Sequence, residues 1–326
     1  MTRALIFGIG GQDGSYLADI LTEKGYTVHG LYRRSSVNNL GRIQHLLSQG
    51  KIELHQGDLA DPGSVERAIL TSRPDEIYNL ADQDDVRWSH RTPGYSADIT
   101  AGAVGRLLQF LCDRFDDVKV FQPVSATMFG NASAPQDENT LIDPLSPYAC
   151  AKAHAYHLAR FYRREHNLWV STGILYNHDS PRRGDGYLLQ KICRAAVRMT
   201  GEQRACNEGR KLNLDRWQRV DVGYAREYME AAWNILQLPQ PDDFVLSSGR
   251  WLIIEDLVHQ AFLYAKVPLE FAESCFQPIR ENTPQNRSFL FGNFSRAEAA
   301  FGFSPVTTAE ELVCGIIEHH LKASGK

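Results

Sequence analysis

The sequence contains no long apolar run, no strong excess of charge of one sign and no cysteines paired at short spacing. No apolar stretch approaches the ~20 residues that a membrane-spanning helix needs, so we expect no membrane association. A strand-like segment follows Met1-Thr-Arg directly, which leaves no room for a signal peptide. A net charge of −4 gives no electrostatic footprint for nucleic acid, and we expect none as a partner.

The distribution of cysteine and histidine also disfavours a metal site. The six cysteines are dispersed, with no C-x-x-C pair and no histidine at zinc-binding spacing around them. We therefore predict no metal ion, and dispersed thiols favour a reducing, cytoplasmic location. His319 and His320 are predicted to lie at the exposed end of a helix rather than in a metal site.

The sequence does contain a regular alternation of apolar, strand-like segments with helical ones. This alternation predicts an α/β fold, a Rossmann-type doubly wound parallel sheet, with a smaller C-terminal substrate-binding lobe. We expect a Rossmann domain that binds NADP over residues 1–176 and a mainly substrate-binding lobe over residues 177–326, with some segments of the lobe returning to the sheet. Strands are predicted near residues 3–7, 27–32, 51–55, 75–79, 118–124 and 169–175, and helices near 15–23, 62–72, 100–115, 146–165, 226–236, 254–265 and 308–322.

The first predicted strand runs directly into a glycine-rich turn. Gly8, Gly11 and Gly14 follow a G-x-x-G-x-x-G spacing between this strand and an amphipathic helix. Such glycines let backbone amides and a helix N-terminus approach a pyrophosphate without a Cβ in the way. The turn, with Gln12 and Asp13 inside it, therefore predicts a dinucleotide-binding site.

The residues after the second strand favour NADP over NAD. NAD-selective domains usually place an acidic residue there for the ribose 2′-hydroxyl, whereas this chain has Arg33-Arg34-Ser35-Ser36. Arginines and hydroxyls suit a 2′-phosphate. A solvated basic loop is the alternative, and NAD stays open as the cofactor. Further along the chain, the residues expected beside the cofactor are Asp58 and Leu59, near the adenine, and Leu80 and Ala81, after the fourth strand.

Tyr148 and Lys152 lie four residues apart in a predicted helix, so both side chains lie on one helix face. A phenol alone titrates near ~10, and a neighbouring ammonium lowers this pKa. The pair therefore predicts a phenolate base that takes the proton of a sugar hydroxyl while the carbon gives up a hydride. Chance occurrence on a surface helix is the alternative.

Five runs of the sequence together resemble one known family. The chain is similar to the extended short-chain dehydrogenases/reductases, and within them most similar to the GDP-mannose 4,6-dehydratase family. The resemblance covers most of residues 3–195 and thins after residue 200. The matching runs are Gly11–Leu17, Val28–Gly30 with Arg33–Ser36, Pro74–Leu80, Ser146–Ala149 with Lys152, and Asn177–Gly184.

This resemblance implies roles for single residues. Tyr148 would oxidise the sugar at C4, Lys152 would hold the nicotinamide ribose, and Ser125 would stand where the family has a catalytic Thr or Ser. Because the family's segment corresponding to residues 33–42 reaches a neighbouring subunit, a homodimer or homotetramer is implied. Further cofactor contacts are expected from Tyr148, Lys152, Tyr176, Asn177 and His178, and substrate contacts from Asn177, Arg182, Lys191 and Arg219.

The chain departs from the family where the family has its catalytic Glu. The family has Thr-Ser-Glu before Leu-Tyr-Gly, but here the run is Ser125-Ala-Thr127-Met-Phe129-Gly130, without a carboxylate. Ser-Ala-Thr resembles UDP-galactose 4-epimerases, and Thr127 is a further candidate catalytic residue. Asp82, Asp84 and Asp85 form an acidic loop that either supplies the missing acid, because like charges raise one another's pKa, or is a solvated loop that caps the next helix.

The phosphate-binding arginines of the family also differ. The family's Arg-Asp-Trp-Gly aligns with Val220-Asp-Val-Gly223, with Arg219 as a shifted substitute, and its Arg-Pro-x-Glu aligns with Thr283-Pro-Gln-Asn286. Two contacts to phosphate and ribose are therefore missing. A nucleotide sugar held differently, or a nucleoside, would both fit.

Together these observations predict an NAD(P)-dependent lyase. It would oxidise the C4 position of a nucleotide sugar or nucleoside, eliminate water and return the hydride. A 4-epimerase or 4-keto reductase is the alternative. A non-catalytic cofactor sensor is disfavoured because Ser125, Tyr148 and Lys152 are all present.

Overall fold

A seven-stranded parallel sheet forms the centre of the computed structural model, which describes residues 1–115, 117–200, 211–278 and 289–324. Its strand order is β10-β6-β5-β4-β1-β2-β3, so the order reverses beside β1 and opens a crevice there at the carboxyl ends of the strands. The predicted doubly wound fold is confirmed. The strands are β1 (Arg3–Phe7), β2 (Thr27–Tyr32), β3 (Ile52–Gln56), β4 (Glu76–Asn79), β5 (Lys119–Ser125), β6 (Val170–Leu175) and β10 (Asp243–Leu246).

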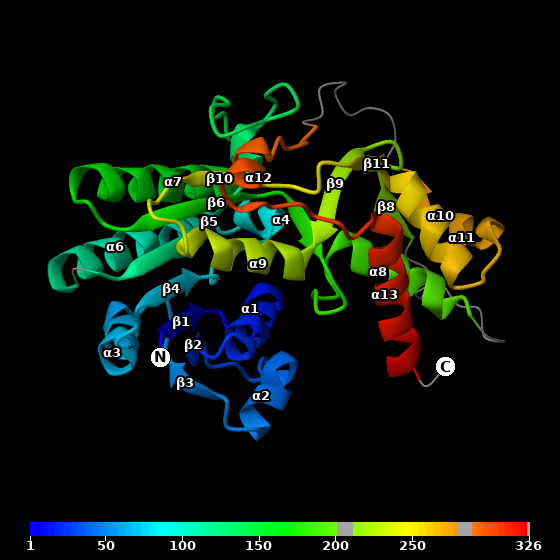
Figure 1. Cartoon of the computed structure of the whole chain (residues 1–326). Helices are drawn as coiled ribbons and strands as arrows, with labels where there is room; N and C mark the ends of the chain where they lie inside the picture. The colour runs from blue at the N-terminus through cyan, green and yellow to red at the C-terminus, as the bar shows by residue number, and fades with distance from the viewer. Residues whose placement is uncertain (116, 201–210, 279–288, 325–326) are drawn as a thin grey trace.

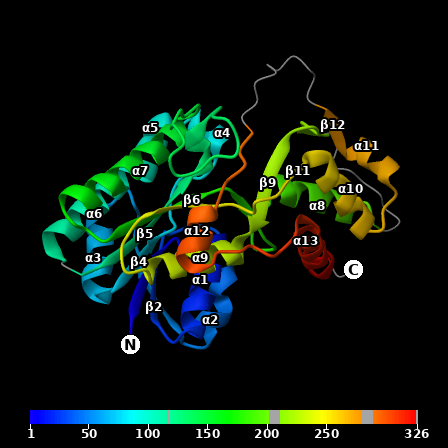
Figure 2. The same cartoon turned by 45° about the horizontal axis from the view of Figure 1, so that its top comes forward.

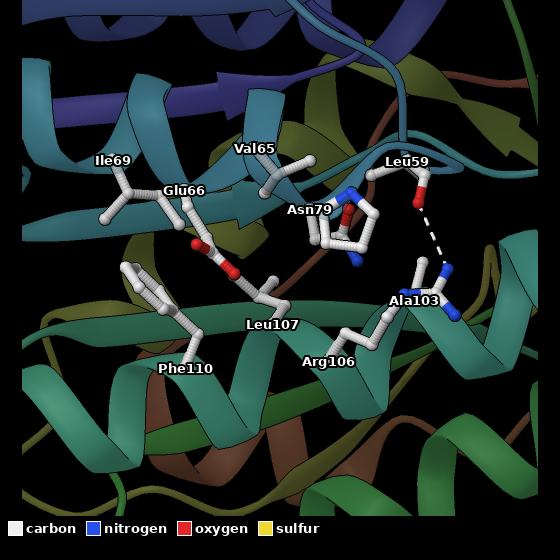
Figure 3. A pocket seen from close by; sticks show the side chains of 10 residues that line it. Leu59, Val65, Glu66, Ile69, Asn79, Ala103, Arg106, Leu107 and Phe110 are labelled. Carbon is white, nitrogen blue, oxygen red and sulfur yellow. Dashed lines mark hydrogen bonds between the residues drawn. The ribbon is translucent and has the colours of Figure 1, made fainter.

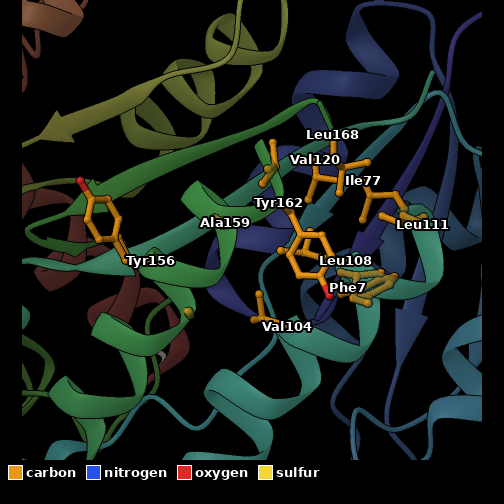
Figure 4. Close-up of a cluster of buried hydrophobic side chains, with 14 of the residues drawn as sticks. Phe7, Ile77, Val104, Leu108, Leu111, Val120, Tyr156, Ala159, Tyr162 and Leu168 are labelled. Atoms are coloured by element: carbon orange, nitrogen blue, oxygen red, sulfur yellow. The ribbon is translucent and has the colours of Figure 1, made fainter. Parts of the chain in front are cut away.

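Helices cover both faces of this sheet (Figure 1). On one face lie α3 (Pro62–Ser72), α6 (Ala103–Arg114) and α7 (Pro147–Glu165), which bury apolar side chains against β1, β4 and β5 (Figure 4). On the other face, α1 (Gln12–Glu23), α2 (Gln44–Ser48) and α9 (Ala225–Leu236) pack on a second core. The shorter segments that pack around α7 are α4 (Val86–Ser89), α5 (Pro93–Ala97), η2 (Asp98–Gly102) and η3 (Ala126–Phe129), whereas η1 (Gly41–Ile43) packs near α1 and α2.

A smaller lobe with its own apolar core lies beside the large sheet (Figure 2). It contains a three-stranded sheet in the order β11-β9-β7 and a two-stranded pair, β12-β8. Its strands are β7 (Asn177–Asp179), β8 (Leu212–Leu214), β9 (Arg219–Tyr224), β11 (Trp251–Ile253) and β12 (Phe276–Pro278). Its helical segments are α8 (Leu188–Arg198), α10 (Ile254–Tyr264), η5 (Leu269–Phe271), α11 (Ala272–Cys275) and α13 (Ala309–Ala323), while α12 (Ser295–Phe301) packs near β10.

The predicted elements differ from the observed ones, for example in three helical segments. Helix α1 begins at Gln12 instead of Ser15, because its first turn is formed by the glycine-rich segment itself. The helix predicted over 100–115 consists of a π-helical turn, η2, followed by α6. Helix α8 was not predicted, although its apolar residues bury one face against α10 and α13. Strand β10 and helix α9, both beyond residue 176, belong to the large sheet and its helical cover.

Two further features bear on the predicted location. Among the described residues, no helix combines the length and apolar character that crossing a membrane requires. Cys112, Cys150, Cys193 and Cys314 are free thiols, but Cys275 is disulfide-bonded. The dispersed cysteines therefore do not establish a reducing compartment by themselves.

Candidate active site

The glycine-rich turn forms a cradle at the carboxyl end of β1. Gly8 has a φ of +74°, and a Cβ there would lie 2.9 Å from the carbonyl oxygen of Leu80. A Cβ on Gly14 would lie only 2.3 Å from the carbonyl oxygen of Gly8. Gly11 caps α1 without a side-chain hydrogen bond, so the amides of the first turn face the crevice without a side-chain acceptor. These features fit the pyrophosphate of a dinucleotide.

The loop after β2 places cationic and hydroxyl groups at the same edge. Arg33, Arg34 and Ser35 are exposed, and Nη1 of Arg33 donates to the Tyr95 hydroxyl at 3.4 Å. The loop folds over the glycine-rich turn, because Arg42 donates from Nη1 to the carbonyl of Gly10 at 3.2 Å. This position suits the 2′-phosphate that the sequence predicts.

A cavity lies between α3 and α6, next to the end of β4 (Figure 3). Leu59 lines it, as does the buried side chain of Asn79 at the end of β4. In the part of the chain that the structure describes, Oδ1 of Asn79 is buried without a hydrogen-bond partner, so a buried acceptor is left over beside the predicted cofactor position. Asp58 itself caps a turn, accepting from the amide of Ala60 at 3.0 Å.

The motif after β6 packs on α1. His178 on β7 is 2.9 Å from the carboxylate of Asp13. Burial raises the pKa of Asp13, but the His178 imidazole, the Arg183 charge and the Gln12 hydrogen bond together outweigh this effect and lower the pKa to about 2. Arg182, predicted to bind substrate, instead donates to Asp19 at 2.7 Å and stacks over Tyr16 at 4.1 Å.

Three more predicted site residues lie in or beside this motif. The hydroxyl of Tyr176 is buried and donates to Oε1 of Gln136 at 2.9 Å. Gln12 accepts from Ser180 at 2.8 Å. Asn177 is exposed on β7. The motif is therefore chiefly a junction between α1 and the smaller lobe.

Ser125, Tyr148 and Lys152 come together at the carboxyl end of β5 and the start of α7. Helix α7 begins there because Ser146 caps it, accepting from the amide of Ala149 at 3.1 Å, and Pro147 occupies its first position. The ammonium of Lys152 lies 5.7 Å from the ring centre of Tyr148, and both side chains are buried. Ser125 is a hydrogen-bond partner of the Tyr148 hydroxyl, and Thr127 donates to Ser125 at 2.9 Å.

The charge of Lys152 is shared with Asp82, which the sequence did not anticipate. Nζ of Lys152 forms an ion pair with the Asp82 carboxylate and donates to the carbonyl of Pro123 at 3.2 Å. Burial raises the pKa of Tyr148 to about 12. The charge of Lys152 lowers this pKa, but the charge of Asp82 opposes that lowering. The expected lowering of the Tyr148 pKa is therefore wrong for this arrangement, since burial and a nearby carboxylate both disfavour the phenolate.

The three aspartates of the loop after β4 have three different environments. Asp84 is hydrogen-bonded to the Tyr187 hydroxyl, and its carboxylate is 4.0 Å from Arg183. The surrounding protein and the Asp82 charge raise the pKa of Asp84. Asp85 caps α4, accepting from the amide of Trp88 at 2.9 Å. Asp85 is therefore the helix cap, whereas Asp82 lies beside Lys152 and Asp84 beside Tyr187.

The remaining predicted substrate residues lie on the smaller lobe. Lys191 on α8 has its pKa lowered by burial and by the nearby Arg87, while Asp85 opposes this. Arg219 is exposed on β9 and stacks over Trp251 at 4.6 Å and Phe289 at 5.2 Å. The segment Thr283–Asn286 lies outside the described residues. Arg183 and Tyr187 were missed, because only the folded chain brings them to Asp84.

The parallel sheet, the glycine cradle and the Ser-Tyr-Lys set define a member of the short-chain dehydrogenases/reductases. Comparison with known proteins then narrows the class. The model of the GDP-mannose 4,6 dehydratase family matches residues 5–315, and the chain belongs to this family.

The chain is similar to GDP-mannose 4,6 dehydratase from Homo sapiens, with 40% identity over 95% of this chain and 89% of that protein. In fold, it resembles a dTDP-glucose 4,6-dehydratase from Streptomyces venezuelae with NAD bound, at 17% identity and a TM-score of 0.86 over 99% of this chain and 98% of that one. A UDP-glucose 4-epimerase from Thermotoga maritima shares the fold at 21% identity and a TM-score of 0.84, over 99% and 100% of the two chains. The predicted resemblance and the predicted class of enzyme, a dehydratase-type lyase, are confirmed.

Proposed function

We propose that this protein is an NADP-dependent 4,6-dehydratase of a nucleotide sugar, in which aspartates of the loop after β4 replace the family's catalytic Glu. The observation that supports this most is the meeting of Asp82 and Asp84 with Tyr148 and Lys152 in one site. NAD(P) dependence follows from family membership and from the cradle at β1. The exposed Arg33 and Ser35 support the phosphorylated form of the cofactor.

The first half of the reaction is an oxidation at C4 of the sugar. Tyr148 takes the proton of the C4 hydroxyl, with Ser125 hydrogen-bonded to the same oxygen. The nicotinamide, when bound, accepts the hydride from C4. The positive charge of Lys152 stabilises the Tyr148 phenolate, and the negative charge of Asp82 partly cancels this stabilisation.

The second half removes water across C5 and C6. The C4 ketone acidifies the C5 hydrogen, and the Asp82 carboxylate takes this proton. Asp84, whose raised pKa favours its protonated form, gives a proton to the C6 hydroxyl, which leaves as water. A proton is then added at C5, and a bound nicotinamide would supply the hydride at C6 and so recover its starting oxidation state.

The test is a product analysis with GDP-mannose, UDP-glucose and dTDP-glucose, each incubated with catalytic NADP in deuterated water. A dehydratase gives a product that has lost one water and carries solvent deuterium. Formation of a C4 epimer without deuterium would identify the 4-epimerase instead. A stoichiometric requirement for NADPH would identify the 4-keto reductase. If none of the three nucleotide sugars is converted, the proposed dehydratase activity on these substrates is contradicted.

The position and hydrogen bond of Thr127 favour a 4-epimerase as the second candidate function. It stands where the family has its Glu, and its hydroxyl hydrogen-bonds to Ser125 rather than supplying a titratable acid. An epimerase needs only the oxidation and its reversal from the opposite face of the ketone. The deuterium measurement separates the two candidates because only elimination exchanges the C5 hydrogen.

We also propose a cytoplasmic homodimer or homotetramer. The exposed segment after β2, in which Val37 is 72% exposed, supports a subunit contact next to the cofactor. Analytical ultracentrifugation tests this, and a monomer at micromolar concentration would contradict it.

A further inference from the structure

Two histidines and a glutamate meet at the free edge of the large sheet, away from the active site. His29 lies on β2, and Glu53 and His55 lie on the edge strand β3. In the parallel register, His29 pairs with Glu53, and His55 follows two residues later. Because side chains alternate along a strand, all three lie on the same face of the sheet. The backbone register thus brings them together independently of side-chain rotamers.

The distances among their side-chain atoms match those between ligands of one metal ion. Nδ1 of His29 is 3.1 Å from Nε2 of His55 and 3.6 Å from Oε2 of Glu53. Two ligands at about 2.0–2.1 Å from a tetrahedral zinc ion lie about 3.3 Å apart. The three atoms are all within 4.8 Å of one another, so small side-chain rotations would let one ion contact all of them.

The surroundings also suit a cation. His29 is buried and held in place, whereas the side chain of Glu53 is 63% exposed and leaves the site open to solvent. Arg3 is the nearby cation that would oppose an ion, but its guanidinium lies 3.9 Å from the Asp75 carboxylate. Imidazole and carboxylate together suit borderline divalent ions such as Zn²⁺.

We propose that His29, Glu53 and His55 bind a divalent transition-metal ion of the zinc type, with the fourth position open to water. The sequence predicts no metal ion because the ligands come from two strands and have none of the short spacings of zinc motifs. The ion would join the edge strand β3 to β2.

The test uses full-length, tag-free protein freed of metal by chelation. Titration with Zn²⁺ against a chromophoric chelator is expected to show one equivalent bound per chain, and Co²⁺ is expected to give the visible absorption of a tetrahedral site. Glu53→Gln and His55→Ala should each weaken Zn²⁺ binding by at least about tenfold. Zn²⁺ in 100-fold excess over its Kd should raise the thermal midpoint of the wild type by about 3 °C or more.

His259→Gln is the matched control. It removes a surface histidine that is 3.1 Å from Glu255 but belongs to no such three-residue cluster among the described residues, so Zn²⁺ binding should not change. The exposure of Glu53 makes Glu53→Gln safe for folding. Absence of Co²⁺ absorption in the wild type, or undiminished binding in both Glu53→Gln and His55→Ala, would overturn the proposal.

Discussion

At the scale of single residues, Lys152 is shared by two groups with opposite effects on catalysis. Its ammonium stabilises the phenolate of Tyr148, whereas Asp82, which pairs with this ammonium, disfavours the phenolate. Together with burial, Asp82 therefore raises the pH at which Tyr148 becomes a base.

Removal of the Asp82 charge should move C4 oxidation to lower pH. Asp82→Asn eliminates a carboxylate that raises the pKa of Tyr148, so the phenolate forms more readily. We expect the rising limb of kcat/KM for oxidation to shift down by about one pH unit. As a control, Asp85→Asn removes a carboxylate charge from the cap of α4 and should leave the pH profile of kcat/KM unchanged. A shift of the profile to higher pH in Asp82→Asn would contradict the proposed effect of Asp82 on Tyr148.

Tyr148 should be required for chemistry but not for cofactor binding. Tyr148→Phe removes the base while leaving the glycine cradle intact, so turnover should fall on the order of 10²-fold or more. Fluorescence titration should show a nearly unchanged Kd for NADPH. Activity above about 10% of wild type would exclude Tyr148 as the base.

At the scale of elements, the loop after β2 should determine the choice between NADP and NAD. Arg33→Ala removes a cation from the end of β2, where the ribose 2′-phosphate is expected. The Kd for NADP should rise about tenfold or more, and the Kd for NAD, measured in parallel as the control, should change little. Equal weakening of both cofactors would contradict a 2′-phosphate contact.

The junction of β9 with the segment after β10 contains a buried carboxylate. Asp221 is fully buried, accepts from the amide of Ser248 at 2.9 Å, and has its pKa raised by burial to about 6. A raised pKa in the folded state means that this group destabilises the fold as pH rises from about 4 through about 6. This loss of folding stability is complete well above pH 6, where Asp221 is ionised in the folded and the unfolded state.

Asp221→Asn should remove this loss of stability. We expect the stability of the variant relative to wild type to increase from pH 4 to pH 8. The increase in the difference between their unfolding free energies should be up to about 3 kcal/mol. Urea denaturation at both pH values measures it, and the exposed Asp117→Asn serves as the control. A difference that is independent of pH would show that Asp221 does not titrate in this range.

At the scale of the whole molecule, the large sheet was more predictable than the site. Runs such as Ala4–Phe7 are fully buried and identify strands from local sequence alone, and the spacing of Tyr148 and Lys152 places both on α7. The contact of Lys152 with Asp82 joins residues 70 positions apart, and no local pattern reports it. Arg182 was assigned to substrate from its motif, yet the fold turns it toward Asp19.

The sign of the Tyr148 pKa shift was missed for the same reason. A neighbouring lysine is visible in the sequence, but burial of the phenol and the approach of Asp82 arise only when α7 packs beside the loop after β4. Asp84 likewise meets Tyr187, 103 residues away, across the two lobes. Local chemistry was therefore predictable, and the electrostatic balance between distant segments was not.

The central claim, that the acidic loop performs the elimination, is tested most directly by single-turnover mass spectrometry of Asp84→Asn with the accepted nucleotide sugar. An amide cannot donate the acid proton, so water loss should slow by at least about 10²-fold while C4 oxidation, followed as reduced nicotinamide, still occurs. Asp85→Asn, at the cap of α4, should eliminate water at nearly the wild-type rate. Water loss at the wild-type rate in Asp84→Asn would contradict the claim.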